Sequence, residues 1–325
     1  MGDRDWMVPS IVLTVATGAV ALPLMPDLSG VFPAIGILPF WMTAAAILAS
    51  IYGFATMIAA RVPRPLAHIR QLVTRDWRWL LMFVFGIFLA GLNMTTFMWI
   101  KPLLNYLVPF HADPMLAAID HALFLGHDPW TLFTWLNTLP MALFYHRVWF
   151  ILMIITLFGV LTAPASPRKS AMMVTYFALW SIVGPVIHSL LPAAGPIFYE
   201  RLGYGDRFAT LAHVSETREV ADYLWSVYTG SRFGPGSGIS AMPSLHIATT
   251  TWIVLATWHF QRRIMIPVAI AAALIFMLSM ALGWHYAADG IVGAAATIGC
   301  FRLLLALFRQ RAARNEAIVP VPAVA

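Results

Sequence analysis

Long apolar segments, separated by short polar ones, are the main pattern along this chain. About 20 apolar residues in a helix are needed to cross the roughly 30 Å hydrocarbon layer of a bilayer. Segments of this kind lie at 34–60, 79–100, 141–163, 171–191, 243–260, 264–282 and 286–308. The pattern therefore predicts an all-α, polytopic integral membrane protein.

A shorter apolar segment at residues 10–25 is either a cleaved signal peptide or a retained span. A signal peptide begins with a positively charged region. Here Asp3 and Asp5 lie beside Arg4. We interpret the segment as a retained transmembrane helix.

Composition points to the membrane as well, because 60% of the 325 residues are hydrophobic, 10% are charged and the mean hydropathy is +0.78. Such a chain has too little polar surface to cover a water-soluble globule of this size. A single cysteine, Cys300, lies in an apolar segment and has no partner for an intrachain disulfide. We therefore expect stability to come from helix packing.

The formal net charge of +6 suggests nucleic-acid binding until the basic residues are located. They gather in short loops, beginning with the loop 61–78. Counting spans outward from that loop places one set of further basic residues on the same side: Arg168, Lys169, Arg262, Arg263, Arg309, Arg311 and Arg314. Positive residues of short loops stay in the cytoplasm. The charge pattern thus indicates membrane topology, and we expect no nucleic-acid partner.

The same alternation divides the chain into parts. Residues 1–78 hold the N-terminal transmembrane helices and the basic loop, and residues 79–310 form a transmembrane core. Residues 311–325 form a cytoplasmic tail that we expect to be disordered.

Two long connections of the core, 101–140 and 192–242, fall on the side opposite the basic loops and carry most of the acidic residues. Each contains an amphipathic stretch, Pro114–Asn137 and Glu216–Tyr228, with aromatic residues typical of a membrane interface. We expect these stretches to cover or rim a site on the outer face.

Two histidine-bearing stretches, AMPSLHIA at 241–248 and GWHYAADG at 283–290, begin spans on this outer side. His285 and Asp289 are four residues apart, a spacing that places both on one face of a helix. The carboxylate would fix one imidazole tautomer and stabilise the positive ring formed when the other nitrogen attacks phosphorus. We expect His285 to be the nucleophile and His246 to be the general acid and base.

The start of the first stretch suggests a phosphate site. Pro243 is tolerated at the beginning of a helix, where backbone N–H groups have no intrahelical acceptor. Ser244 and these free N–H groups would together bind an anion.

The two stretches resemble the second and third signature motifs of the type 2 phosphatidic acid phosphatase superfamily of integral membrane enzymes. The likeness is closer to the branch that includes inositol phosphorylceramide synthases, because Leu245 replaces the glycine of lipid phosphatases and Tyr286 follows the histidine. LLPAAGP at 190–196 and PMLAAIDHALFLGHDPW at 114–130 also resemble segments of that branch. The resemblance extends from Asp113 to Leu307.

The resemblance implies a six-helix catalytic core. The apolar segments of this chain then leave about two N-terminal transmembrane helices before that core. It also implies a two-step phosphotransfer that uses no metal and no cofactor and passes through a phosphohistidine. At the matching motif positions the catalytic residues would be His246, His285 and Asp289. The substrate would be a phospholipid or another lipid phosphate.

The chain departs from the superfamily's pattern in its cations. The first motif, Lys followed after six residues by Arg-Pro, is reduced to Lys101 and Val108-Pro109, and Ser279 replaces the arginine of the third motif. A transferring phosphoryl group needs donors around its equatorial oxygens. The outer-side candidates are Lys101, Arg201, Arg207, Arg218 and Arg232, of which we select Arg232, Lys101 and Arg207.

Several alternatives stay open at this point. Either histidine alone could be a structural hydrogen-bonding residue, and His and Asp at this spacing plus a second His could hold zinc. By default we interpret six other histidines as structural or interfacial: His111, His121, His127, His146, His188 and His213.

Three functions compete. A lipid phosphotransferase would move a phosphorylated headgroup to a lipid or alcohol, and a lipid phosphate phosphatase would use water as the acceptor. A polytopic lipid-binding protein or transporter is the alternative of another class. We expect a plasma membrane, such as a bacterial inner membrane, with the site on its periplasmic face.

Overall fold

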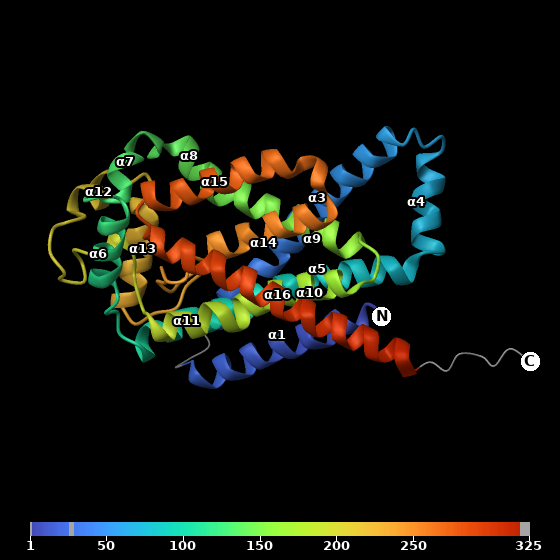
Figure 1. Cartoon of the computed structure of the whole chain (residues 1–325), viewed down its shortest axis with the longest axis horizontal. Helices are drawn as coiled ribbons and strands as arrows, with labels where there is room; N and C mark the ends of the chain where they lie inside the picture. Colours follow the sequence, from blue (N-terminus) through green and yellow to red (C-terminus); the bar gives the residue numbers. More distant parts are fainter. Residues whose placement is uncertain (1, 26–28, 319–325) are drawn as a thin grey trace, which may run out of the picture.

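The computed structural model describes residues 2–25 and 29–318, and within them the chain is a bundle of helices (Figure 1). Seven helical segments of these described residues are long and apolar enough to span a membrane. They are α1 (Arg4–Leu24), α2–α3 (Val31–Ile35 and Ile37–Ala59), α5 (Trp77–Leu107), α8–α9 (Leu139–Leu143 and Trp149–Thr162), α10–α11 (Pro167–Ala178 and Gly184–Leu190), α15 (Met265–Ala281) and α16 (Ala287–Ile318). The predicted all-α membrane fold is confirmed.

The central helix of the bundle is α14 (Leu245–Phe260), which has 16 residues. Neighbouring helices surround it, so that Trp252 is fully buried and donates from its indole nitrogen to the carbonyl of Met172 in α10 over 2.8 Å. Gly293 lets α16 approach its start, because a Cβ there would lie 2.7 Å from the carbonyl oxygen of Ser244. This close packing brings the two histidine-bearing stretches together.

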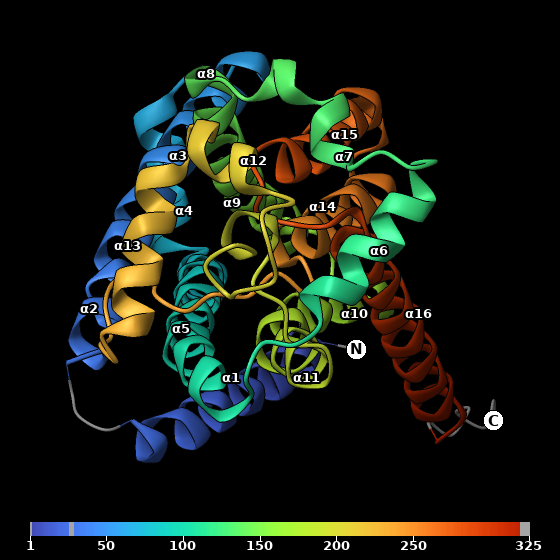
Figure 2. The same cartoon turned by 90° about the vertical axis from the view of Figure 1, so that its left-hand side faces the viewer.

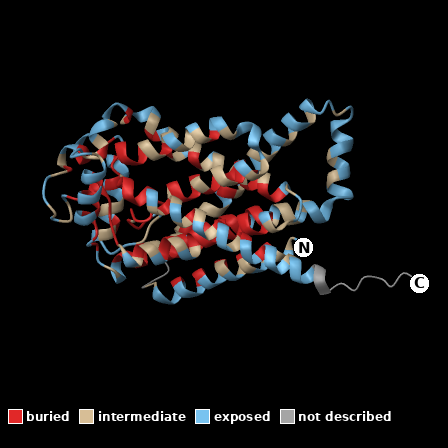
Figure 3. Cartoon of the chain, in the orientation of Figure 1, coloured by how far each residue is buried: buried red, intermediate tan, exposed pale blue. Residues whose placement is uncertain are grey.

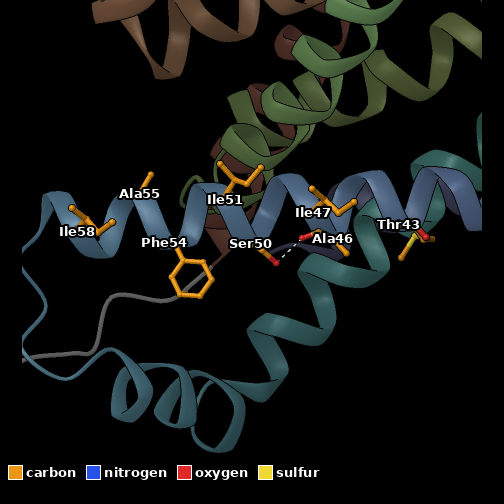
Figure 4. A pocket seen from close by; sticks show the side chains of 9 residues that line it. Thr43, Ala46, Ile47, Ser50, Ile51, Phe54, Ala55 and Ile58 are labelled. Atoms are coloured by element: carbon orange, nitrogen blue, oxygen red, sulfur yellow. Dashed lines mark hydrogen bonds between the residues drawn. The ribbon is translucent and has the colours of Figure 1, made fainter.

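The N-terminal helices pack against α5. Trp41 of α3 donates a 2.9 Å hydrogen bond to the carbonyl of Ile87, and Gly91 provides the space for the indole ring. Beyond this contact α3 diverges from the bundle towards α4 (Pro65–Thr74) (Figure 1). The diverging half borders an open space of about 1010 Å³, lined between Met42 and Ile58 by mainly apolar residues together with Thr43 and Ser50 (Figure 4).

The two ends of the bundle differ. One end carries α4, the start of α1 and the end of α16. The other carries the short helices α6 (Asp113–Leu123), α7 (Pro129–Leu132), α12 (Ala209–Val214) and α13 (Arg218–Thr229). Figure 2, which looks onto this second end, shows α6 and α13 on opposite sides of it. Burial is concentrated inside the bundle and beneath these helices, whereas α4 is exposed (Figure 3).

Two boundaries differ from those expected. Helix α5 continues to Leu107, so Lys101 lies inside a helix and not in the connection 101–140. The side-chain amide of Asn105 anchors the last turn of α5 to the backbone of Ile239. Its NH2 group donates to the carbonyl oxygen of Ile239, and its oxygen accepts from the N–H of Ile239, each over 2.6 Å. Helix α16 continues to Ile318, so residues 311–318 of the expected tail are helical, and 319–325 lie outside the described residues.

Candidate active site

A cavity of about 440 Å³ lies beneath the end that carries α6 and α13. Its wall combines the start of α14, the segment before α16 and parts of α3, α5, α9 and α13. Lys101, His146, His246 and His285 are among the lining residues. The remaining wall is largely aromatic and aliphatic, so the polar groups meet inside an apolar pocket.

The structure brings His246 and His285 together from separate helices. Their ring centroids are 6.3 Å apart, and both rings line the cavity. His246 is held by aromatic contacts, with its centroid 4.7 Å from that of Tyr145 and 4.2 Å from that of Trp149. Its ring forms no hydrogen bond with the described residues.

His285 is oriented at one ring nitrogen by a hydrogen bond and by an ion-pair contact. Its Nδ1 lies 2.9 Å from the carbonyl oxygen of Ala241 and 3.6 Å from Oδ2 of Asp289. A carbonyl oxygen can only accept, so Nδ1 carries a proton, and in the neutral ring the lone pair is then on Nε2. The sequence predicted the role of Asp289 but missed the carbonyl of Ala241, which holds the same tautomer.

Asp289 makes its contacts across the start of α16, because that helix begins at Ala287 and His285 precedes it. Oδ2 of Asp289 accepts from the backbone N–H of Tyr286 over 2.9 Å. This bond from the third helical residue back to the N-cap is one half of a capping box. The predicted pairing along one helix face is therefore replaced by a pairing around the helix N-terminus, where a carboxylate also complements the helix dipole.

Ser244 is fully buried and acts as the N-cap of α14. Its hydroxyl accepts from the N–H of Ile247 over 3.4 Å, and its own N–H donates to the carbonyl of Asp289 over 3.1 Å. Ser244 is not among the lining residues of the cavity, whereas Pro243 and Leu245 are. Its hydroxyl is therefore engaged in the helix cap and in joining the two histidine-bearing segments.

The expected cations occupy different places. Lys101 lines the cavity and forms no hydrogen bond or ion pair with the described residues. Arg207 pairs with Asp128 and donates to the carbonyl of Ala117, and neither Arg207 nor Arg232 is a lining residue. Among the described lining residues, Lys101 is thus the one lysine or arginine. Within residues 2–25 and 29–318, no three or more His, Cys, Asp or Glu residues are grouped to hold a metal ion.

The geometry can be compared with known proteins. A family model described as the PAP2 superfamily matches residues 114–303, which is more than half of the 325 residues. The chain belongs to the PAP2 superfamily. PAP2 members are phosphatases and phosphotransferases, so the protein is an enzyme of this general kind in an integral membrane fold. No curated protein and no solved structure matches the chain.

The PAP2 match confirms the superfamily inferred from the two motifs. The match leaves out α1 to α5 and therefore Lys101.

Two carboxylates of α6, which the sequence analysis missed, hold the PAP2 motif segments in place. Asp120 accepts from the N–H groups of Ala287 and Ala288 over 2.6 and 3.0 Å, and so caps α16 from outside the helix. Asp113 accepts from the N–H of Gly195 over 2.8 Å and from the hydroxyl of Tyr286 over 3.1 Å. The seven-residue spacing of Asp113 and Asp120 on one face of an amphipathic helix was the available signal.

Burial raises the pKa of both α6 carboxyl groups, and the N–H groups that they accept from oppose this shift. Each carboxyl group is almost fully enclosed. The hydrogen bonds compensate the loss of water around the charge, because a buried charge needs donors in place of solvent. The start of α16 thus depends on a charge in another helix.

The Pro- and Gly-containing segment 190–196 forms the other support of His285. Gly195 has φ of +104°, which favours glycine, and a Cβ there would lie 2.4 Å from the carbonyl oxygen of Trp284. Just after this segment, the N–H of Ile197 donates a 2.9 Å hydrogen bond to the carbonyl of Gly283, two residues before His285. His188 at the end of α11 contacts the carbonyl of Met242 and has the structural position expected by default.

Asp120→Asn is expected to lower kcat by about 10- to 100-fold with little change in KM. Each carboxylate oxygen of Asp120 accepts from one N–H group, and the Asn side chain replaces one of these acceptors by an NH2 donor. A buried N–H without an acceptor costs roughly 1–3 kcal/mol. Turnover of a phospholipid donor in proteoliposomes measures the effect. Asp206→Asn, at an exposed position, is the control. Equal kinetics for the two variants would remove the positioning role of Asp120.

Proposed function

We propose that the protein is a membrane phosphotransferase that moves a phosphorylated lipid headgroup to a lipid or alcohol acceptor. The observation that carries the proposal is the geometry at His285: Nδ1 is occupied by Ala241 and Asp289, and Nε2 is free in a cavity shared with His246. A fixed neutral imidazole with an available lone pair is what nucleophilic attack on phosphorus requires.

In the first step Nε2 of His285 bonds to phosphorus as the ester bond to the leaving alcohol breaks. His246 donates a proton to the leaving oxygen. The ring of His285 becomes positively charged, and Asp289 stabilises this charge from 3.6 Å. In the second step His246 takes the proton of the acceptor hydroxyl, whose oxygen bonds to phosphorus while the bond between phosphorus and nitrogen breaks.

Lys101 is the proposed cation for the phosphate oxygens. Its ammonium group has no described partner and lines the same cavity as both histidines. Charge on the equatorial oxygens of a phosphoryl group has to be neutralised in the transition state. Lys101 belongs to α5, so the proposed site draws on a helix outside the PAP2 match.

The apolar wall supports a lipid ester as the substrate. Ile37 and Phe40 of α3, Met98 of α5 and Phe150 of α9 line the cavity together with the polar groups. An alkyl chain beside a phosphate group fits both parts of this wall. The likeness of Leu245 and Tyr286 to inositol phosphorylceramide synthases favours headgroup transfer, and a phosphatase that uses water is the alternative.

The orientation that we propose places the end with α6 and α13 outside the cytoplasm. The basic residues of the opposite end supply the reason, because short positively charged loops stay in the cytoplasm. In a bacterial cell the candidate site would then face the periplasm.

His285→Ala is expected to abolish turnover of phospholipid donors, while His259→Ala, at the far end of α14, is expected to keep wild-type turnover. Purified variants in proteoliposomes are supplied with a donor labelled at phosphorus, and mass spectrometry follows the label. A new phospholipid indicates transfer, and free phosphate or a released phosphorylated headgroup indicates water as the acceptor.

A phosphorylated protein that is stable to alkali and labile to acid is expected in the wild type and absent in His285→Ala. Turnover by a well-expressed His285→Ala variant would exclude the proposed nucleophile. Phosphorus label bound covalently to the His285→Ala protein would also exclude His285 as the nucleophile.

Lys101→Met is expected to lower kcat/KM by about 10- to 100-fold, because a hydrogen bond to a charged group contributes roughly 1.5–3 kcal/mol. Arg232→Met removes a positive charge outside the lining and is expected to stay within about twofold of the wild type. The comparison is made with the same labelled donor. If Arg232→Met were the more damaging variant, the phosphate-binding role would pass from Lys101 to Arg232.

Cysteine labelling tests the orientation in a Cys300→Ser background. Leu125 near α6 is 90% exposed and Leu66 in α4 is 82% exposed. An impermeant maleimide is expected to label Leu125→Cys in intact spheroplasts and Leu66→Cys only after permeabilisation. The reverse pattern would place the candidate site on the cytoplasmic side.

A further inference from the structure

Three buried ring nitrogens of the described lining residues, those of His146, Trp180 and Trp284, have no hydrogen-bond partner and no role in the steps described above. Two of them belong to rings next to the histidines of the proposed mechanism. His146 Nε2 and Trp284 Nε1 are buried and have no hydrogen-bond partner within the described part of the chain. Both residues line the cavity. Buried polar atoms in folded proteins nearly always have a partner, so these two point to a bound molecule.

The two rings lie next to the proposed acid and base. The ring centroid of His146 is 5.9 Å from that of His246 and 6.3 Å from that of Trp284. His246 is in turn 6.3 Å from His285, which follows Trp284 in the chain. The four rings therefore enclose one part of the cavity.

Local backbone structure places both rings outside regular helix faces. His146 lies in the π-helical turn Phe144–Val148 between α8 and α9, and such turns are frequent at functional sites. Trp284 lies in the irregular segment before α16, where Gly195 packs against its carbonyl oxygen. Sequence alone gave His146 no partner, because its neighbours come from α14 and from that irregular segment.

The in-line geometry of phosphotransfer indicates which reacting group lies in this part of the cavity. The attacking and the leaving atom lie roughly in line on opposite sides of phosphorus. With His285 on one side, the leaving or incoming oxygen lies beside His246, and His146 and Trp284 adjoin that position. An indole N–H can only donate, whereas an imidazole nitrogen can donate or accept. The pair suits an alcohol that carries a second oxygen near its hydroxyl group.

We propose that His146 and Trp284 form the alcohol subsite, which holds first the leaving alcohol and then the acceptor alcohol. This inference rests on the proposed function. The ligand is a lipid alcohol whose hydroxyl group has a neighbouring carbonyl group. Diacylglycerol, with ester carbonyls, and an N-acyl amino alcohol such as ceramide, with an amide carbonyl, share this chemistry.

The test compares three acceptors with the wild type and with His146→Phe and Trp284→Phe, which keep an aromatic ring and remove the nitrogen. The acceptors are diacylglycerol, ceramide and hexadecanol, the last of which has no second oxygen. Labelled phospholipid is the donor in proteoliposomes, and kcat/KM is measured for each acceptor. Trp130→Phe is the matched control, because its buried Nε1 also has no described partner but lies outside the cavity wall.

The wild type and Trp130→Phe are expected to prefer one or both carbonyl-bearing acceptors over hexadecanol by at least about tenfold. A higher kcat/KM with diacylglycerol would indicate recognition of an ester carbonyl, and a higher kcat/KM with ceramide would indicate recognition of an amide carbonyl. His146→Phe and Trp284→Phe are expected to lose most of this preference while transfer to hexadecanol and release of headgroup phosphate to water persist.

An unchanged preference in both subsite variants would overturn the inference, and so would an equal loss for every acceptor and for water. Absence of donor turnover by the wild type in every arm would instead refute the proposed function.

Discussion

Backbone N–H groups at the start of α16 need acceptors, and the carboxylate of Asp120 in α6 supplies them. The first N–H groups of a helix have no intrahelical partner, and an unsatisfied one in an apolar protein interior is costly. Meeting this requirement from another helix fixes the place where α16 begins. The position of His285, two residues before that start, follows from it.

Asp113, also in α6, accepts hydrogen bonds from the N–H of Gly195 and from the hydroxyl of Tyr286. The surface helix α6 therefore joins two segments that are far apart in the sequence. On the inner side, Ala241 at the beginning of the other motif accepts from His285. The position of the proposed nucleophile thus depends on three acceptors: Asp120 at the start of α16, Asp113 at Tyr286, and the carbonyl of Ala241 at the ring itself. The other ring nitrogen is left without one of these contacts.

The cavity itself combines two kinds of wall that a lipid phosphoester requires. Aromatic and aliphatic side chains from α3, α5 and α9 line it together with Lys101 and the histidines, which we propose provide charge and proton transfer. In such surroundings an electrostatic contact is stronger than in water. Helix α5 contributes to both walls, although it precedes the segment that matches the PAP2 superfamily.

The apolar segments and the clustered arginines alone determined that this is a helical membrane protein, because span length and loop charge are local properties of the sequence. The two motifs likewise indicated His246, His285 and Asp289 as neighbours. Only the tertiary structure decided that Ala241 shares the orientation of His285, that Lys101 enters the cavity and that Arg207 pairs with Asp128. Those contacts join residues distant in the chain, so they depend on how the helices pack.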